Sequence, residues 1–299
     1  MTGATGFVGG ATLRQAIAAG WHVRALTRRP QADRDGVTWV SGALDDTASL
    51  ADMAAGSDAM LHIAGVVNVP TRAAFEAGNV TATANVVEAA RGAGVGRFIH
   101  VSSLAAREPG LSNYGWSKEG AEKLVEASGL AWTIVRPPAV FGPGDTEMLD
   151  LFRMARRGMM LLPPRGRMSA IYVEELARLL LALAADRDLG IGQVYEPDDG
   201  RPAGWSHRSF ARAVGRATGR GRVSTLAIPA ALLKAGGRID PLLRRGRAKL
   251  TPDRARYIAH PDWVATEGAR PPAALWRPET DTDDALAATV RWYRKENWL

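Results

Sequence analysis

The sequence predicts an α/β protein built on a doubly wound parallel sheet, followed by a smaller, mostly helical C-terminal region. Two observations carry this prediction. A glycine-rich turn opens the chain at residues 3–9, and short apolar segments then alternate with amphipathic segments as far as residue 136. Such alternation is typical of units in which each helix connects two parallel strands.

The first half supplies most of the sheet. The helical pattern after the glycines ends at Gly20, and glycine commonly terminates helices. Five short apolar segments are predicted to be strands: 22–27, 37–40, 59–65, 98–103 and 131–136. Three segments are predicted to be helices: 11–19, 72–91 and 113–128.

The second half is less regular. Pro137-Pro138 and the glycine- and proline-rich segment 141–145 interrupt the alternation. A helix over 173–185 and a strand at 192–196 resume it. Further helices are expected at three places, near 206–217, 229–236 and 283–295.

The composition is that of an ordinary globular protein, with 46% hydrophobic and 23% charged residues. The chain has no cysteine, which excludes disulfides and cysteine ligands, and its five histidines lack HxH or HExxH spacing. We therefore expect no metal site. No apolar segment approaches the ~20 residues that a membrane span requires. The start of the chain does not resemble a signal peptide, so we expect a cytoplasmic protein.

The net charge of +7 comes mostly from arginine, with dense groups at 244–247 and at Arg153, Arg156 and Arg157. An excess of positive charge is typical of proteins that bind nucleic acid, an anionic membrane or an anionic ligand. Because no nucleic-acid motif accompanies these groups, we expect a solvated surface and no nucleic-acid partner.

The glycine-rich turn predicts a nucleotide site. Gly3, Gly6 and Gly9 form the pattern G-x-x-G-x-x-G at the start of a helix. Glycine lets the backbone approach a pyrophosphate, and the helix N-terminus supplies free N–H groups and positive partial charge. After the second strand stands Thr27-Arg28-Arg29 rather than an acidic residue, which favours NADP over NAD, with Arg28 ahead of Arg29.

A second pattern indicates acid–base chemistry. Tyr114 and Lys118 are four residues apart, so a helix places them on one face. An ammonium beside a phenol is expected to lower its pKa from ~10 toward neutrality. Ser102 and Ser103 end the preceding strand, where a hydroxyl can donate to a substrate oxygen.

These residues resemble the extended branch of the short-chain dehydrogenase/reductase superfamily, the NAD-dependent epimerase/dehydratase-like group. The similarity runs over nearly the whole chain, and its specific parts are 2–9, 62–65, Ser102-Ser103, Tyr114-x-x-x-Lys118, 136–145, 275–278 and 292–294. It implies a Rossmann domain at 1–145 that binds NADP, with NAD possible. It also implies a substrate-binding region at 146–299, of which about 166–197 returns to the sheet.

The resemblance also implies roles for individual residues. Tyr114 would be the general acid/base, Lys118 its partner and a ribose ligand, and Ser103 the group that orients the substrate oxygen, ahead of Ser102. The implied cofactor contacts are Gly3, Thr5, Gly6, Phe7, Val8, Arg28, Leu44, Ala64, Gly65, Lys118 and Pro137.

Two departures from the family pattern narrow the substrate. Ala139 stands where members that act on nucleotide sugars usually carry asparagine, and Ala43 replaces an aspartate that commonly contacts adenine. The Arg-Pro-Pro segment resembles the 3β-hydroxysteroid dehydrogenase and dihydroflavonol reductase branch. We therefore expect an oxidoreductase that transfers hydride between nicotinamide and a secondary alcohol or ketone of a mainly hydrophobic small molecule. The alternatives are a nucleotide-sugar epimerase/dehydratase and a non-enzymatic cofactor-binding sensor or accessory subunit.

Three further expectations concern surfaces and ends. Residues 222–250 resemble a substrate cover, whose apolar content and flanking arginines suit a hydrophobic ligand or loose attachment to anionic lipid, although an ordinary packed helix is favoured. Helices 72–91 and 113–128 are those through which relatives pair, which suggests a homodimer. Only Met1 and Thr2 precede the turn, where relatives carry about five more residues, so restoring an upstream strand is expected to raise stability and NADP affinity.

Overall fold

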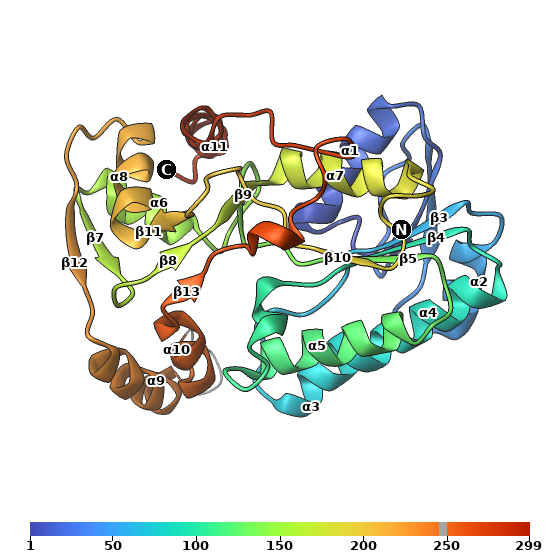
Figure 1. The fold of residues 1–299 in the computed structure, drawn as a ribbon, viewed down its shortest axis with the longest axis horizontal. Helices are drawn as coiled ribbons and strands as arrows, with labels where there is room; N and C mark the ends of the chain where they lie inside the picture. The colour runs from blue at the N-terminus through green and yellow to red at the C-terminus, as the bar shows by residue number, and fades with distance from the viewer. Residues whose placement is uncertain (245–249) are drawn as a thin grey trace. The chain divides into compact units, whose positions relative to one another are not determined.

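The computed structural model describes residues 1–244 and 250–299 (Figure 1). These residues form two compact units. The first unit comprises Met1–Pro137, Glu174–Pro197 and Ala269–Arg277, and the second comprises Pro138–Val173, Asp198–Gly268 and Pro278–Leu299. The side chains of the arginine group at 244–247 lie outside the described part of the chain.

The first unit contains six strands and six α-helices among its described residues. The strands are β1 (Val23–Thr27), β2 (Val37–Ser41), β3 (Ala59–His62), β4 (Arg97–Val101), β5 (Trp132–Val135) and β10 (Gln193–Tyr195). The helices are α1 (Phe7–Ala18), α2 (Thr47–Ala54), α3 (Arg72–Phe75), α4 (Ala82–Gly92), α5 (Asn113–Glu126) and α7 (Val173–Ala185). Sequence reasoning missed α2, although Asp46 caps it by accepting from the backbone N–H groups of Ala48 and Ser49.

All strand pairs of this unit are parallel. β2 pairs with β1, and β3, β4, β5 and β10 follow one another in a second set. Met1 and Thr2 lie between the two sets, because Leu26 N–H donates to the Met1 carbonyl (3.1 Å) and Thr2 N–H donates to the Leu61 carbonyl (3.0 Å). The predicted doubly wound α/β fold is confirmed, with α4 and α5 on one side of the sheet and α1 and α7 on the other (Figure 1).

The predicted helix over 72–91 is interrupted by a π-helical segment. Residues Arg72–Phe75 form α3, Glu76–Thr81 form the π-helical segment, and Ala82 then begins α4. Such segments insert an extra residue into a helix and are frequent at functional sites. Asn79 lies in this segment and is buried.

The second unit has short strands and its own core. Its strands are β6 (Ala139–Phe141), β7 (Met159–Leu162), β8 (Arg167–Met168), β9 (Ala170–Tyr172), β11 (Trp205–Ser206), β12 (Ser224–Ala227) and β13 (Asp262–Trp263). Its helices are α6 (Leu149–Arg156), α8 (His207–Ala217), α9 (Ala230–Arg244), α10 (Pro252–Ala259) and α11 (Thr282–Lys295). Phe141, Phe152 and Tyr293 lie at the centre of its core.

The observed division differs from the expected boundary at residue 145. Residues 139–141 form β6, which pairs with β9 within the second unit, so this unit begins at Pro138. For the same reason the returning segment starts at Glu174 rather than near 166, and a further segment, 269–277, also belongs to the first unit. The methionines at 148, 154, 160 and 168 pack in or against the second unit's core, whereas Met159 is exposed.

Two histidines are buried side by side in the first unit. His62 and His100 are register partners on β3 and β4, and their ring centroids are 5.3 Å apart. Nδ1 of His62 lies 2.7 Å from the Thr2 hydroxyl, and Nε2 lies 3.0 Å from the Thr83 hydroxyl. Because the Thr83 hydroxyl donates to the Asn79 carbonyl (2.6 Å), it accepts from Nε2–H. This assigns His62 as the neutral Nε2–H tautomer, with Thr2 donating to Nδ1.

Burial keeps both rings neutral. It lowers the pKa of His62 to about 3, and the Lys118 ammonium adds to the effect. The pKa of His100 also lies well below its ordinary value for the same two reasons. In the unfolded chain both rings regain a pKa of about 6.5. The unfolded state therefore binds more protons than the folded state between about pH 6.5 and pH 3.

This difference predicts a loss of stability in mild acid. The free energy of unfolding should fall as pH is lowered from 7 to 5, with a slope that approaches about 1.4 kcal/mol per pH unit for each buried histidine. The measurement is urea unfolding at several pH values. The His62→Gln variant should lose part of this slope. Equal slopes in the two proteins would contradict the assignment.

Candidate functional site

The glycine-rich turn depends on glycine at two positions. Gly3 has a φ of +75°, and a Cβ there would lie 2.7 Å from the Ala64 backbone nitrogen. A Cβ at Gly9 would lie 1.9 Å from the Gly3 carbonyl oxygen, so glycine is needed for α1 to pack onto the turn. The turn is thus held against the end of β3.

The N-terminus of α1 suits an anion. Gly6 is the N-cap residue, no side chain caps the helix, and its first turn contains no acidic residue. The free N–H groups of this turn and the helix dipole therefore favour a negatively charged group. Thr5 and Gly6 are exposed at this end, with Phe7 and Val8 in the first turn. These features fit the pyrophosphate of a dinucleotide.

The other predicted cofactor contacts follow the carboxyl ends of neighbouring parallel strands, which meet at one edge of the sheet. Arg28 is exposed directly after β1, and the Leu44 carbonyl, beyond β2, accepts from the Asn85 amide (2.9 Å). Ala64 N–H, after β3, donates to the Thr2 hydroxyl (3.2 Å), and Gly65 follows. The carbonyl of the buried Pro137, after β5, accepts from Leu104 N–H (3.1 Å).

Ser103 and Tyr114 are in direct contact at this edge. Ser103 follows β4 and caps the short 3₁₀ helix Leu104–Arg107, accepting from Ala105 N–H (3.2 Å). Tyr114 lies in the first turn of α5, and its side chain is hydrogen-bonded to that of Ser103. A Cβ at Gly115 would lie 2.5 Å from the Ala105 carbonyl oxygen. Glycine at 115 therefore lets α5 approach the serine turn closely.

The phenol of Tyr114 is held in its protonated form. Burial raises its pKa above the ordinary value, and the hydrogen bond with Ser103 opposes this shift only in part. The sequence predicted the opposite direction, a pKa lowered by Lys118. The physical reason for the difference is desolvation, which penalises the phenolate more than its surroundings stabilise it.

Lys118 is buried one turn further along α5. Its Nζ donates to the Val101 carbonyl (2.8 Å), and a Cβ built on Gly65 would lie 3.7 Å from that nitrogen. Burial lowers the pKa of Lys118 to about 8, while the nearby Glu122 carboxylate acts in the opposite direction. The side chain is therefore largely cationic at neutral pH. The structure thus brings Lys118 close to the predicted contact Gly65.

A buried ion-pair network fixes Glu122. Arg136 donates to both carboxylate oxygens of Glu122, at 2.9 and 2.6 Å. The Arg136 guanidinium also lies 3.6 Å from one carboxylate oxygen of Glu196. The other oxygen of Glu196 accepts a hydrogen bond from Arg107 (3.2 Å). The arginine of the predicted Arg-Pro-Pro segment therefore orients the carboxylate that supports the Lys118 cation.

Asn79 is a site residue that sequence reasoning missed. Its amide oxygen accepts from Val66 N–H (2.7 Å), and its amide nitrogen donates to the Val66 carbonyl (2.9 Å) and to the Ser117 hydroxyl (2.8 Å). Ser117 in turn donates to the Tyr114 carbonyl (2.8 Å). In the sequence, Asn79 is visible only as an amide side chain within a predicted helix. A regular helix does not predict that this side chain turns toward Val66 and Ser117.

Ser102 differs from its neighbour. It is buried, and its hydroxyl has no hydrogen-bond partner among the described residues, whereas Ser103 is bonded to Tyr114. The nitrogens of His100 on the same strand are likewise buried without a partner in the described part of the chain. Of the two serines, only Ser103 acts on the pKa of Tyr114.

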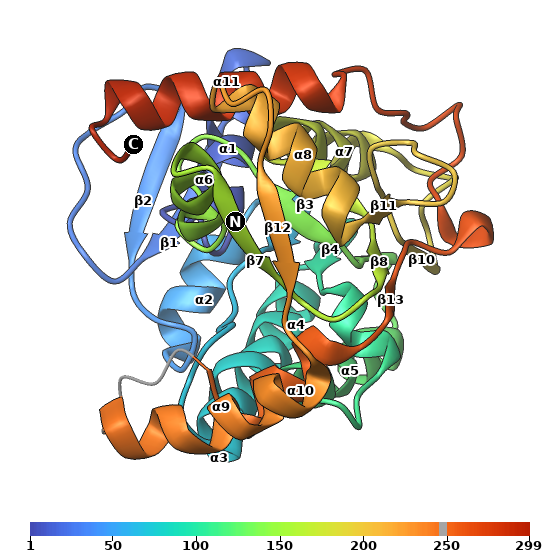
Figure 2. The same cartoon turned by 90° about the vertical axis from the view of Figure 1, so that its left-hand side faces the viewer.

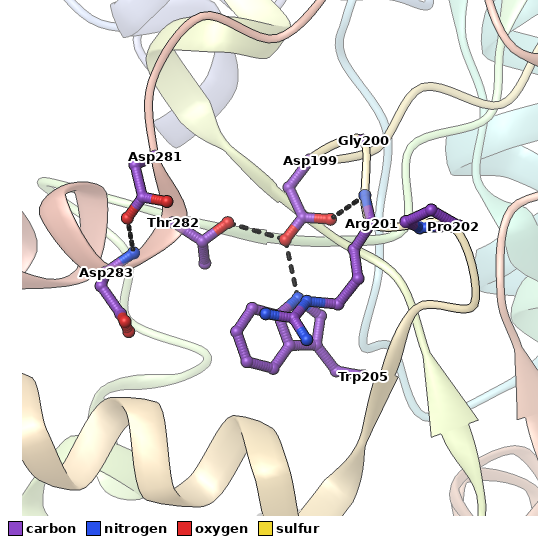
Figure 3. Close-up of a pocket in the computed structure, with 8 residues that line it drawn as sticks. All are labelled: Asp199, Gly200, Arg201, Pro202, Trp205, Asp281, Thr282 and Asp283. Atoms are coloured by element: carbon purple, nitrogen blue, oxygen red, sulfur yellow. Dashed lines mark hydrogen bonds between the residues drawn. The ribbon is translucent and has the colours of Figure 1, made fainter.

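A separate pocket of about 370 Å³ lies in the second unit. Its lining residues are Asp199, Gly200, Arg201, Pro202, Trp205, Asp281, Thr282 and Asp283 (Figure 3). The Asp199 carboxylate accepts from Trp205 Nε1 (2.7 Å) and from the Thr282 hydroxyl (2.7 Å), and Arg201 lies over the Trp205 ring (3.7 Å). These groups join the start of α11 to the loop before β11. None of the predicted site residues lines this pocket.

Two kinds of site are absent from the described residues. No group of three or more histidine, aspartate or glutamate side chains is placed to hold a metal ion. No helix within 1–244 or 250–299 has the length and apolar character needed to cross a membrane.

Comparison with known proteins places this site in a family. Residues 3–185 match the NAD(P)H-binding family. The chain is 37% identical to the ceramide reductase of Caulobacter vibrioides (strain NA1000 / CB15N), an alignment that covers all of this chain and 95% of the relative. It is 31% identical to the 4-hydroxy-2-methyl-3-oxo-4-farnesyl-3,4-dihydroquinoline-1-oxide ketoreductase of Stigmatella aurantiaca, over 68% of each chain.

Among solved structures, MoeE5 in complex with UDP-glucose and NAD has the same fold. The TM-score is 0.76 at 22% identity, over 99% of this chain and 98% of that one. The chain belongs to the NAD(P)H-binding family of extended short-chain dehydrogenases/reductases, and it is an NAD(P)-dependent oxidoreductase.

Proposed function

We propose that the enzyme reduces a ketone on a long, mainly hydrophobic molecule, with NADPH as the preferred cofactor and Tyr114 as the proton donor. The observation that carries this proposal is the close approach of Tyr114, in the first turn of α5, to the turn at Ser103 after β4, which glycine at 115 permits. Because burial raises the pKa of Tyr114, the phenol stays protonated, which is the form that a ketone reduction requires. This favours the reductive direction.

In this mechanism the cofactor supplies the hydride. The glycine turn and the N-terminus of α1 would hold its pyrophosphate, and Arg28 would hold a 2′-phosphate. Ser103 donates a hydrogen bond to the substrate carbonyl oxygen, and Tyr114 passes its proton to the same oxygen as negative charge develops there. The Lys118 cation, supported by Glu122, stabilises the phenolate that remains.

The nature of the substrate rests on two supports. The relatives named above are a ceramide reductase and a ketoreductase of a farnesyl-bearing compound. In addition, Ala139 stands where members that act on nucleotide sugars usually carry asparagine. A nucleotide-sugar epimerase is a relative at lower identity, 25%. Net consumption of NADPH with a hydrophobic ketone separates the two activities, because an epimerase consumes no cofactor overall.

The homodimer and the cytoplasmic location stay predictions.

The first test changes the proton donor. Tyr114→Phe should lower kcat for NADPH-dependent ketone reduction about a thousandfold, because the remaining ring cannot donate a proton. NADPH affinity, measured by fluorescence titration, should stay the same. Suitable substrates are ketones in a series of increasing alkyl chain length.

The two serines provide a matched pair for this test. Ser103→Ala should lower kcat about tenfold or more because it removes the partner of Tyr114. Ser102→Ala removes a buried hydroxyl without a described partner, so it should preserve both activity and the unfolding temperature. Full activity of Tyr114→Phe, or equal losses in the two serine variants, would refute the mechanism.

The second test concerns cofactor choice. Arg28→Ala should weaken NADPH binding about tenfold to a hundredfold while leaving NADH binding unchanged, because only NADPH carries the 2′-phosphate. Arg29→Ala is the control, since its neighbour is favoured as the phosphate ligand. The readout is the ratio of the two dissociation constants by calorimetry. If this ratio is the same in the parent and in Arg28→Ala, the assignment of Arg28 is wrong.

A further inference from the structure

Two adjacent strands of the second unit expose apolar side chains on one face. β7 and β12 pair in parallel, with Leu161 opposite Leu226 and Met159 opposite Ser224. The exposed fractions are 58% for Met159, 44% for Leu161 and 61% for Leu226. Since residues opposite one another in a sheet point to the same face, these three side chains form one apolar patch.

Helix α9 continues this exposure. It begins at Ala230, directly after β12, and exposes Leu232 (63%) and Ile239 (51%). These two residues are seven positions apart, so they lie on the same side of the helix. Leu233 is buried, and Gly237 packs closely against Thr251, so the other side of α9 faces the unit. Both views show β12 and α9 on the same side of the second unit (Figures 1 and 2). We call these five residues, Met159, Leu161, Leu226, Leu232 and Ile239, the apolar strip.

The strip is accompanied by basic residues from a stretch of sequence that contains no acids. Residues 201–239 contain eight arginines and lysines and no aspartate or glutamate. Six exposed cations flank the strip in sequence: Arg156, Arg157, Arg220, Arg222, Lys234 and Arg238. The Arg220 guanidinium donates to the Arg156 carbonyl (2.8 Å), which brings the residues before β7 and those before β12 together. Asp240, the first acid after this stretch, accepts from Leu250 N–H (2.9 Å).

We propose that the apolar strip and its flanking cations dock on the surface of a lipid bilayer that contains anionic headgroups. The leucines and Ile239 enter the boundary between headgroups and acyl chains, while the cations contact lipid phosphates. The charge pattern selects this occupant. A nucleic acid would engage the cations but leave the leucines in water, and a neutral apolar partner would leave the cations without counter-charge. The inference goes beyond the proposed reaction and holds whatever the substrate is.

The test is co-sedimentation of the full chain with vesicles. The protein should bind vesicles of phosphatidylcholine with roughly 30 mol% phosphatidylglycerol and should bind pure phosphatidylcholine at least tenfold more weakly. Leu226→Ser and Leu232→Ser should each weaken binding to the anionic vesicles about tenfold. The double change Lys234→Gln and Arg238→Gln should weaken it further and should reduce its sensitivity to salt.

A matched control comes from the first unit. Leu189 is similarly exposed (47%), and Leu189→Ser should leave vesicle binding unchanged. Unfolding temperatures and NADPH affinities of all variants verify that the fold is intact, and ketone reduction without vesicles reports on the proposed function separately. Three outcomes overturn the proposal: no binding to anionic vesicles, binding that survives both leucine changes, and binding to duplex DNA that exceeds binding to the vesicles.

Discussion

Two runs of hydrogen bonds meet at Asn79 and connect the start of the glycine-rich turn to Tyr114. One runs from the Thr2 hydroxyl through His62 and Thr83 to the Asn79 backbone carbonyl, and the other from the Asn79 side-chain amide through Ser117 to the Tyr114 carbonyl. Each hydroxyl or ring in them uses one donor and one acceptor, so the direction of one bond sets the direction of the next. A protonated His62 would present two donors and break this order. The depressed pKa of His62 is therefore consistent with the geometry that the site requires.

The same low-dielectric interior acts differently on three kinds of group. It keeps the imidazoles of His62 and His100 neutral and raises the pKa of the Tyr114 phenol. For Lys118 it lowers the pKa to about 8, yet the Val101 carbonyl and the nearby Glu122 still support the cation. The result is one neutral phenol and one buried positive charge on the same helix. Without Arg136, the Glu122 carboxylate would lose the partner that orients it, and its support of the Lys118 cation would weaken.

Local patterns in the sequence predicted much of this site. The glycines at 3, 6 and 9 predicted a tight turn because steric limits on a Cβ are local, and the spacing of Tyr114 and Lys118 predicted a shared helix face. The direction of the Tyr114 pKa shift could not be predicted, because desolvation depends on what surrounds the ring in three dimensions. Asn79 was missed because its role depends on a departure from regular helix. Short strands such as β6 and β12 carry too little pattern to be recognised alone.

The π-helical segment lets one continuous helix present two different faces. Each residue of an α-helix turns the following residues by about 100°. One inserted residue therefore rotates α4 relative to α3, so that Phe75 can meet the Tyr114 ring while Val86 and Val87 still reach the core beside the sheet. If residues 76–81 wound as a regular α-helix without the wide turn, α4 would rotate by about 100° relative to α3, and either the core face or the site face would turn to the wrong side. The backbone geometry of this segment is thus as constrained as its residue identity.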